Sequence, residues 1–244
     1  MTSNQKQLLF TIIFIAILLY ADPVYAGPGG TVAKAFFKTW WGKTILGLLT
    51  IIFLPLIIYM KTVEFFAVRK AKKELFKIGL INKDFSWLNV EKHVTNTFTR
   101  VYKAWNNEDM KEVSEYVNHW YWQNQQSVHL DKWKSENLKN VCHLESINKI
   151  KPLYLEISDD DNFEGSKIAF SITANVEDYL IDRDSRRIVK GKNGYNSEEK
   201  IWIMEYSNKK WLLDDIRDGD LSLQFAKLKN VIPESISEGI LSKG

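Results

Sequence analysis

The stretch IWIMEYSNKKWLLDDI, residues 201–216, indicates the fold class because it is typical of a β-hairpin. Two apolar-rich runs flank the polar sequence Ser207–Lys210, as two strands flank a tight turn. Apolar and polar residues also alternate over Pro152–Ile157 and Lys167–Leu180, and the polar residues 181–199 separate these runs from the hairpin. The second half of the chain is therefore expected to form an antiparallel sheet.

The residues before this sheet have a helical pattern. One helix face is formed by Val90, Val94, Phe98, Val101 and Trp105, at spacings of three and four residues. Asn106-Asn107 ends this helix, and a second apolar helical face is expected over Met110–Tyr121. A third helical segment covers Ser127–Asn140, and an amphipathic segment at Leu221–Leu228 follows the sheet. Helices first and strands afterwards predict an α+β fold with the helices on one face of a curved sheet.

Composition limits the function classes. The chain has 244 residues, and its single cysteine, Cys142, forms no intramolecular disulfide. Residues 1–83 hold 11 Lys/Arg and 3 Asp/Glu, whereas the remainder is mildly acidic. The globular part, expected over residues 84–230 with a tail at 231–244, is thus a poor candidate for binding nucleic acid through its phosphates.

Two apolar stretches lie near the N-terminus. The first, Leu8–Ala21, is followed by Pro23 and by small residues ending at Ala26, which indicates a signal peptide over residues 1–26. An uncleaved first membrane helix is the alternative. Residues 27–43 form a short linker rich in glycine and aromatic residues.

The second stretch, Thr44–Met60, contains 17 residues and no charge, the low end of what spans a bilayer. Aromatic residues at both ends suit a membrane interface, and a buried helix of a soluble domain is the alternative. Basic residues are more numerous after this span than before it. The positive-inside rule therefore predicts a single span in the inner (cytoplasmic) membrane, or two spans if the first segment is retained, with the C-terminal domain in the cytoplasm.

A basic amphipathic connector is expected over residues 61–83. Val68, Ala71, Leu75 and Ile78 share one helix face, and lysines lie opposite. The residues expected to contact anionic headgroups are Arg69, Lys70, Lys72, Lys73 and Lys77. Alternatively, these charges only set the topology and keep a stalk solvated, which would leave the apolar stripe without an explanation.

Several pieces of the second half together resemble the Tim44-like domain family. They are FTRVYKAW at 98–105, NVEDY at 175–179, RIVKG at 187–191 and the hairpin EEKIWIMEY…WLLDDI at 198–216. The match covers roughly residues 85–218. The resemblance implies an NTF2-like cone of helices on a curved sheet, in a bacterial, membrane-anchored member. The mitochondrial member tethers a chaperone motor at a protein-import channel through a region with no counterpart here, so that role is not transferred.

The residues give little sign of catalysis. None of the four histidines has metal-ligand spacing with a cysteine or carboxylate, so no metal and no cofactor are expected. Cys142 is expected to be an unreactive core thiol, because no positive cluster adjoins it. We therefore expect no catalytic residues and a non-enzymatic protein.

The run His119-Trp120-Tyr121-Trp122 cannot place all four side chains on one side of a helix, so at least one should be exposed or face the cone. The candidate pocket residues are Val117, His119, Trp120, Tyr121, Phe170, Ile172 and Ile203, and the cavity is expected to be apolar.

We expect a membrane-tethered binding or scaffold module that docks an unidentified protein, or a lipid, and is linked to protein transport or membrane-complex assembly. Expected partners are the membrane, with anionic lipid, and that protein, but neither nucleic acid nor a metal. The first alternative is a periplasmic NTF2-like subunit of a secretion channel. The second is an enzyme, which would need a base such as Asp178 near a pocket tyrosine or histidine.

Overall fold

The computed structural model describes residues 38–236, and the chain divides into two units, residues 1–61 and 62–244. The expectations for residues 1–26, for most of the 27–43 linker and for the end of the tail lie outside the described residues. Helix α3 begins at Trp40 and continues through Pro55 to Gly79. It is long and apolar enough to cross a membrane. Its most apolar stretch of 18 residues is 0% buried, whereas the core helix of a soluble protein is mostly buried.

Within the second unit, the connector packs on the domain. Ala71, Leu75 and Ile78 are fully buried in its main core. The apolar stripe predicted to lie beside a membrane is therefore explained by tertiary packing, and this corrects the interpretation made from the sequence. Lys72 lies over the Trp87 ring, 4.0 Å from its centroid.

The other basic residues of the connector differ in their surroundings. The ammonium of Lys77 lies 3.0 Å from the Glu74 carboxylate. Arg69, Lys70 and Lys73 are exposed, so these three are the connector's freely accessible basic residues among the five predicted to contact headgroups.

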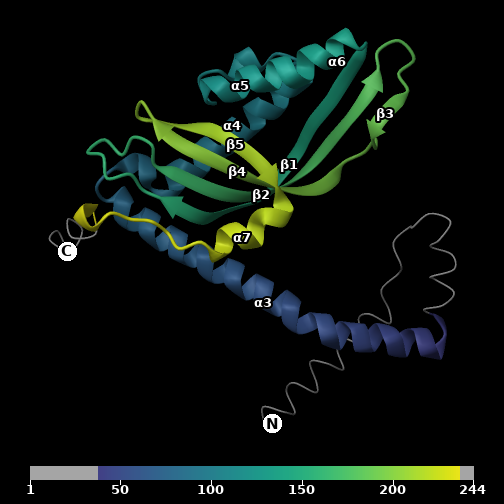
Figure 1. Cartoon of the computed structure of the whole chain (residues 1–244), viewed down its shortest axis with the longest axis horizontal. Coiled ribbons are helices and arrows are strands. Elements are labelled where there is room, and N and C mark those ends of the chain that lie inside the picture. The colour runs from purple at the N-terminus through teal and green to yellow at the C-terminus, as the bar shows by residue number, and fades with distance from the viewer. Residues whose placement is uncertain (1–37, 237–244) are drawn as a thin grey trace. The chain divides into compact units, whose positions relative to one another are not determined.

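A five-stranded antiparallel sheet forms the body of the second unit (Figure 1). Its strands are β1 (Leu138–Glu156), β2 (Lys167–Asp182), β3 (Ile188–Gly191), β4 (Asn196–Ser207) and β5 (Lys210–Asp218). They are ordered β1-β2-β4-β5, with the short β3 also paired to β2. The predicted hairpin is confirmed: Asn208 and Lys209 form its turn with positive φ angles, 51° and 61°, which suit the twist of the two strands.

Helices cover both faces of this sheet. The larger core lies under α4 (Trp87–Asn107), α5 (His119–Gln125) and α6 (Asp131–Ser135), which pack on the concave face (Figure 1). A smaller cluster on the other face joins Leu153, Ala169 and Ile201 to α7 (Ser222–Lys227) and to Val68 of α3. The α+β, NTF2-like fold expected from the sequence is confirmed, but the expectation that the helices lie on one face is wrong, because α7 and the connector part of α3 cover the other face. The prediction that α4 uses the face of Val90, Val94, Phe98 and Val101 is also confirmed.

The second predicted helix is wrong as a single element. A 3₁₀ turn, η2 (Met110–Val113), is followed by an extended Asn118 before α5 begins. The backbone N–H of Asn118 donates to the Leu213 carbonyl at 2.8 Å, and the Leu213 N–H donates to Tyr116 at 2.9 Å. Pairing with β5 therefore interrupts a pattern that is helical in period. A π-helical turn, η3 (Gln126–Leu130), joins α5 to α6.

The start of the first strand was also predicted wrongly, because β1 begins at Leu138 instead of Pro152. Its pairing with β2 shifts register between Leu144 and Ser146, between Ile147 and Lys149, and between Pro152 and Tyr154. Each β-bulge resets the alternation of side chains between the two faces. The period-2 pattern is thus lost over the first two-thirds of β1.

Candidate functional site

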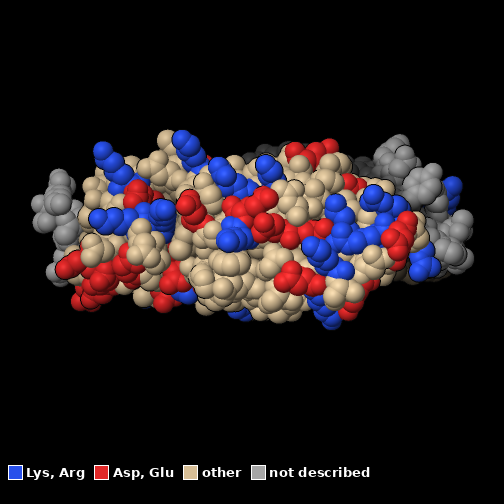
Figure 2. Space-filling model, turned by 90° about the horizontal axis from the view of Figure 1, so that it is seen from above, with Lys and Arg blue, Asp and Glu red and all other residues tan. Residues whose placement is uncertain are grey.

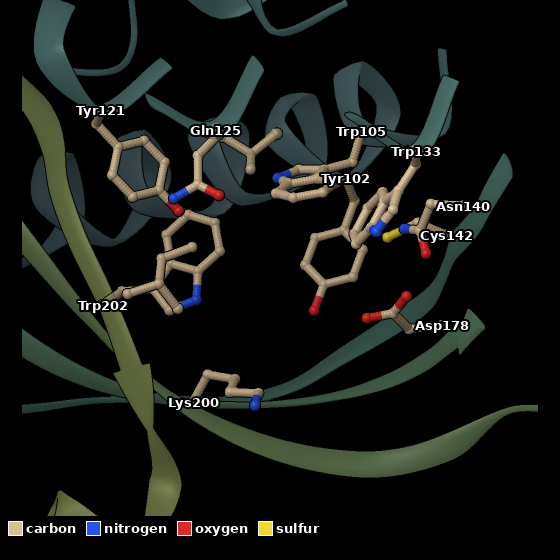
Figure 3. Close-up of a pocket in the computed structure, with 12 residues that line it drawn as sticks. Tyr102, Trp105, Tyr121, Gln125, Trp133, Asn140, Cys142, Asp178, Lys200 and Trp202 are labelled. Carbon is tan, nitrogen blue, oxygen red and sulfur yellow. The ribbon is translucent and has the colours of Figure 1, made fainter. Parts of the chain in front are cut away.

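A cavity of about 270 Å³ opens on the concave face of the sheet, beneath α4, α5 and α6. Five aromatic side chains line it: Tyr102, Trp105, Tyr121, Trp133 and Trp202 (Figure 3). Its polar lining consists of Gln125, Asn140, Cys142, Asp178 and Lys200, and Val101 and Ile216 complete it. The cavity is therefore rich in aromatic rings and has one acidic and one basic side chain.

Strand register brings the polar groups together. Cys142 pairs directly with Asp178 across β1 and β2, so the two side chains share the concave face. Asn140 lies two residues before Cys142 and faces the same way. On β4, Lys200 and Trp202 are likewise two residues apart. On the helical side, Tyr102 and Trp105 come from adjacent turns of α4.

Asp178 lines the cavity, and its side chain is exposed to solvent. Partial desolvation raises the pKa of its carboxyl group, and a hydrogen bond from Asn140 and the charges of Lys200 and Lys190 oppose this shift. The ammonium of Lys200 lies 3.0 Å from Asp218 on β5. Among residues 38–236, no basic side chain forms a contact ion pair with Asp178.

Tyr102 and Cys142 lie deeper in the cavity and are neutral at physiological pH. Burial raises the pKa of the Tyr102 hydroxyl, and the charges of nearby carboxylates, Asp178 among them, raise it further. Burial likewise raises the pKa of the Cys142 thiol. A thiol held in its protonated form is a poor nucleophile, as expected from the sequence.

One buried donor in the cavity wall has no acceptor. The side chain of Trp202 is 1% exposed, and its indole nitrogen, Nε1, is buried without a hydrogen-bond partner. Figure 3 shows this nitrogen on the edge of the ring that faces the space between Tyr102 and Lys200. An unpaired buried donor costs about 1–3 kcal/mol, so a native structure rarely keeps one without a reason.

Only one of the seven predicted pocket residues, Tyr121, lines the cavity. Val117, Phe170 and Ile172 are buried in the main core, and Ile203 packs on the opposite face of the sheet. His119 and Trp120 are exposed.

Exposure within the run His119–Trp122 is as expected, because Trp120 is 52% exposed and donates from its indole N–H to Asp214 at 3.2 Å. The expectation of an apolar cavity is wrong, since Asp178, Lys200 and Asn140 line it.

From the sequence, Asp178 was named only as the base that an enzyme would need, and the other polar residues of the cavity were missed. Asp178 has the same parity as Ile172 on the predicted strand Lys167–Leu180, so the alternation places it on the concave face. Lys200 lies just before the predicted strand that begins at Ile201, and Ile203 was taken as an inward residue of that strand, so the pattern gave no signal for Lys200. Asn140 and Cys142 had none, because their part of β1 was not predicted as a strand. His93, on α4, hydrogen-bonds through Nε2 to the Trp211 carbonyl at 2.6 Å, and burial lowers its pKa. In the described residues, no group of three or more His, Cys, Asp or Glu side chains could hold a metal ion.

Comparisons with known proteins give no identity. No family model matches the chain, and no curated protein matches its sequence. Among solved structures, the chain is similar to the intermembrane space region of the chloroplast protein ARC6, with a TM-score of 0.36 and 8% sequence identity. The match covers 51% of this chain and 92% of that one. At this TM-score, the likeness carries no argument about function.

Proposed function

We propose that this chain is a membrane-tethered, non-enzymatic binding module of the Tim44-like type, whose cone cavity docks a segment of a partner protein. The aromatic cavity with its unpaired Trp202 donor carries this proposal, because aromatic walls with a few convergent polar groups are typical of binding pockets. A role in protein transport or in the assembly of a membrane complex would use such a module.

The tether is the apolar part of α3, with the span at Thr44–Met60. The first domain-packed side chain of the connector, Val63, follows only three residues after Met60. The excess of basic residues after the span supports a cytoplasmic location for the domain, in a protein of the inner membrane. If the span is correct, the full chain stays in the membrane fraction during extraction with alkaline carbonate. Release of most of the protein would contradict it.

Topology separates this proposal from its first alternative, a periplasmic subunit of a secretion channel. Reporter fusions after Gly244, one active only in the cytoplasm and one only outside it, give opposite results for the two. Activity of the cytoplasmic reporter is expected. Activity of the external reporter would favour the periplasmic alternative.

The charge distribution supports a protein partner over a nucleic acid. On the face seen in Figure 2, basic and acidic side chains are interspersed over most of the surface, and acidic side chains border the group of basic ones toward the right. A phosphate backbone needs several basic contacts in a row.

The docking role is tested by photo-crosslinking in intact cells. A benzoylphenylalanine replaces Trp133, in the cavity wall, or His143, which is exposed and next to the inward-facing Cys142 on β1. A discrete protein adduct is expected from position 133 and none of the same mass from position 143. Adducts to lipid alone, or identical adducts at both positions, would overturn protein docking in the cavity.

An enzyme remains the second candidate, because Asp178 and Tyr102 line one cavity, the pairing that the sequence required of such an enzyme. A carboxylate of raised pKa in a cleft is a candidate general base. If the role is binding alone, Asp178→Asn leaves crosslinking at position 133 in place with at most a change in yield. Accumulation of a small molecule in cells that carry only this variant would favour the enzyme.

A further inference from the structure

Resting on the proposed docking role, we infer that the cavity binds an organic cation next to a carbonyl oxygen, as in an arginine or lysine residue of the docked segment. The cation lies against Asp178 and the aromatic walls, and the carbonyl oxygen accepts a hydrogen bond from Trp202 Nε1.

The preference for a cation follows from the charges of the cavity. The Asp178 carboxylate has the Asn140 amide as its hydrogen-bond partner and, in the described residues, no contact ion pair. The lysine that shares the cavity, Lys200, pairs with Asp218 instead, at 3.0 Å. A cationic ligand would therefore supply the counter-ion that Asp178 lacks.

The aromatic rings add to this preference. Tyr102, Trp105 and Trp133 stand on the side of the cavity that faces Asp178 (Figure 3). The face of an aromatic ring attracts a cation, most strongly when water is excluded, and tryptophan is the strongest such ring. A neutral apolar ligand would fill the same walls but leave the carboxylate without a counter-ion in contact with it.

The requirement for an acceptor comes from Trp202. Its Nε1–H is buried at the cavity wall and finds no acceptor within the protein. The Lys200 side chain lies beside it in Figure 3, and Lys200 is only partly buried and flexible enough to give way to a ligand. A peptide carbonyl next to a basic side chain has the needed acceptor within reach of the cation.

The test uses the full chain in detergent micelles and isothermal titration calorimetry with three probes. N-acetyl-arginine methylamide carries both the cation and the carbonyl groups. N-acetyl-citrulline methylamide is its neutral analogue, and butylguanidinium is a cation without a carbonyl. The arginine probe is expected to bind with a Kd on the order of 1 mM or tighter. The citrulline probe should bind about tenfold more weakly, because the charge-assisted contact is lost.

Two variants assign these differences to residues. Asp178→Asn keeps the size of the side chain and should bring the arginine and citrulline probes to equal affinity. Asp161→Asn makes the same change in net charge on an exposed loop at the other end of β2, and should behave as wild type. Trp202→Phe should weaken the arginine probe about fivefold and leave butylguanidinium unchanged.

The inference is overturned if the arginine probe does not saturate, if citrulline binds equally well, or if Asp178→Asn matches Asp161→Asn. Should Trp202→Phe fail to fold, equal affinity of the wild type for the arginine probe and butylguanidinium would overturn the role of the carbonyl. If position 133 gives a crosslinked protein but no probe binds, the docking function is retained and only the proposed binding of a cation is overturned. If neither the crosslinked protein nor probe binding is observed, both the docking function and the cation site are overturned.

Discussion

Replacing Leu75 with alanine tests whether the apolar stripe of the connector belongs to the domain or to the membrane surface. Leu75 is fully buried, and its substitution removes three carbon atoms from the main core. At about 0.8 kcal/mol per buried methylene, this loss is about 2.4 kcal/mol. The cavity left behind brings the expected loss in free energy of unfolding to about 3–4 kcal/mol. The matched control is Phe76→Ala, the next residue along the helix, which is 68% exposed and should cost less than about 0.5 kcal/mol.

Urea unfolding of the full chain in micelles, followed by tryptophan fluorescence, measures both variants. With a urea dependence of about 2 kcal/mol per molar, the Leu75 substitution should lower the midpoint by about 1.5–2 M. If Leu75→Ala changes the midpoint no more than Phe76→Ala does, the stripe is not part of the folded core. The connector would then be free to lie on a membrane, as its sequence alone suggests.

Three further predictions concern a turn, a titration and the membrane surface. Gly191 has φ of +86°, and a Cβ there would lie 2.9 Å from the Asp178 carbonyl oxygen, so Gly191→Ala should lower the melting temperature more than Gly165→Ala, whose φ is +80° with open space around it. Because desolvation raises the pKa of Asp178 in the folded state, the native protein binds this proton more tightly. Its ionisation therefore lowers the stability of the protein as the pH rises above 3.8, the pKa of this carboxyl group in the unfolded chain. Asp178→Asn should accordingly be more stable than wild type at pH 7 but not at pH 3.5. Equal melting temperatures of the two proteins at both pH values would contradict this. Finally, a chain beginning at Lys61 should bind anionic vesicles less as salt rises, and Lys70→Glu with Lys73→Glu should abolish binding; unchanged sedimentation would leave these lysines as topology determinants only.

Much of the sheet could be predicted from the sequence, because its regular strands keep one alternation throughout. Lys167–Leu180 was predicted nearly to its ends, since β2 pairs with β4 without a register shift from Lys167 to Val176. The short β3 was not predicted as a strand, because its four exposed residues contain no buried face to mark one.

The candidate site was harder to predict, because contacts between distant parts of the chain decide which residues line the cavity. Helical spacing around Val117 indicated a pocket wall, but a bridge to Leu213 turns this residue into the core. Trp120 was a reasonable pocket residue by size, yet its hydrogen bond to Asp214 holds it outside. Which apolar residues line a cavity and which fill the core depends on pairings between distant parts of the chain, and periodicity does not contain that information.

The three bulges of β1 have a consequence for how the width of the cavity can change in evolution. β1 has 19 residues where its partner β2 has 16, and the three register shifts account for the difference. At about 3.3 Å per residue, the edge strand β1 is about 10 Å longer than the part of β2 with which it pairs. This additional length allows the sheet to curve, with β1 on the outside of the curve. Two of the extra residues, Glu145 and Asn148, lie outside both clusters of buried side chains. Deletion of either residue would shorten β1 and reduce the curvature of the sheet without removing a core side chain. The width of the cavity can therefore vary among descendants of this chain while the fold is inherited unchanged.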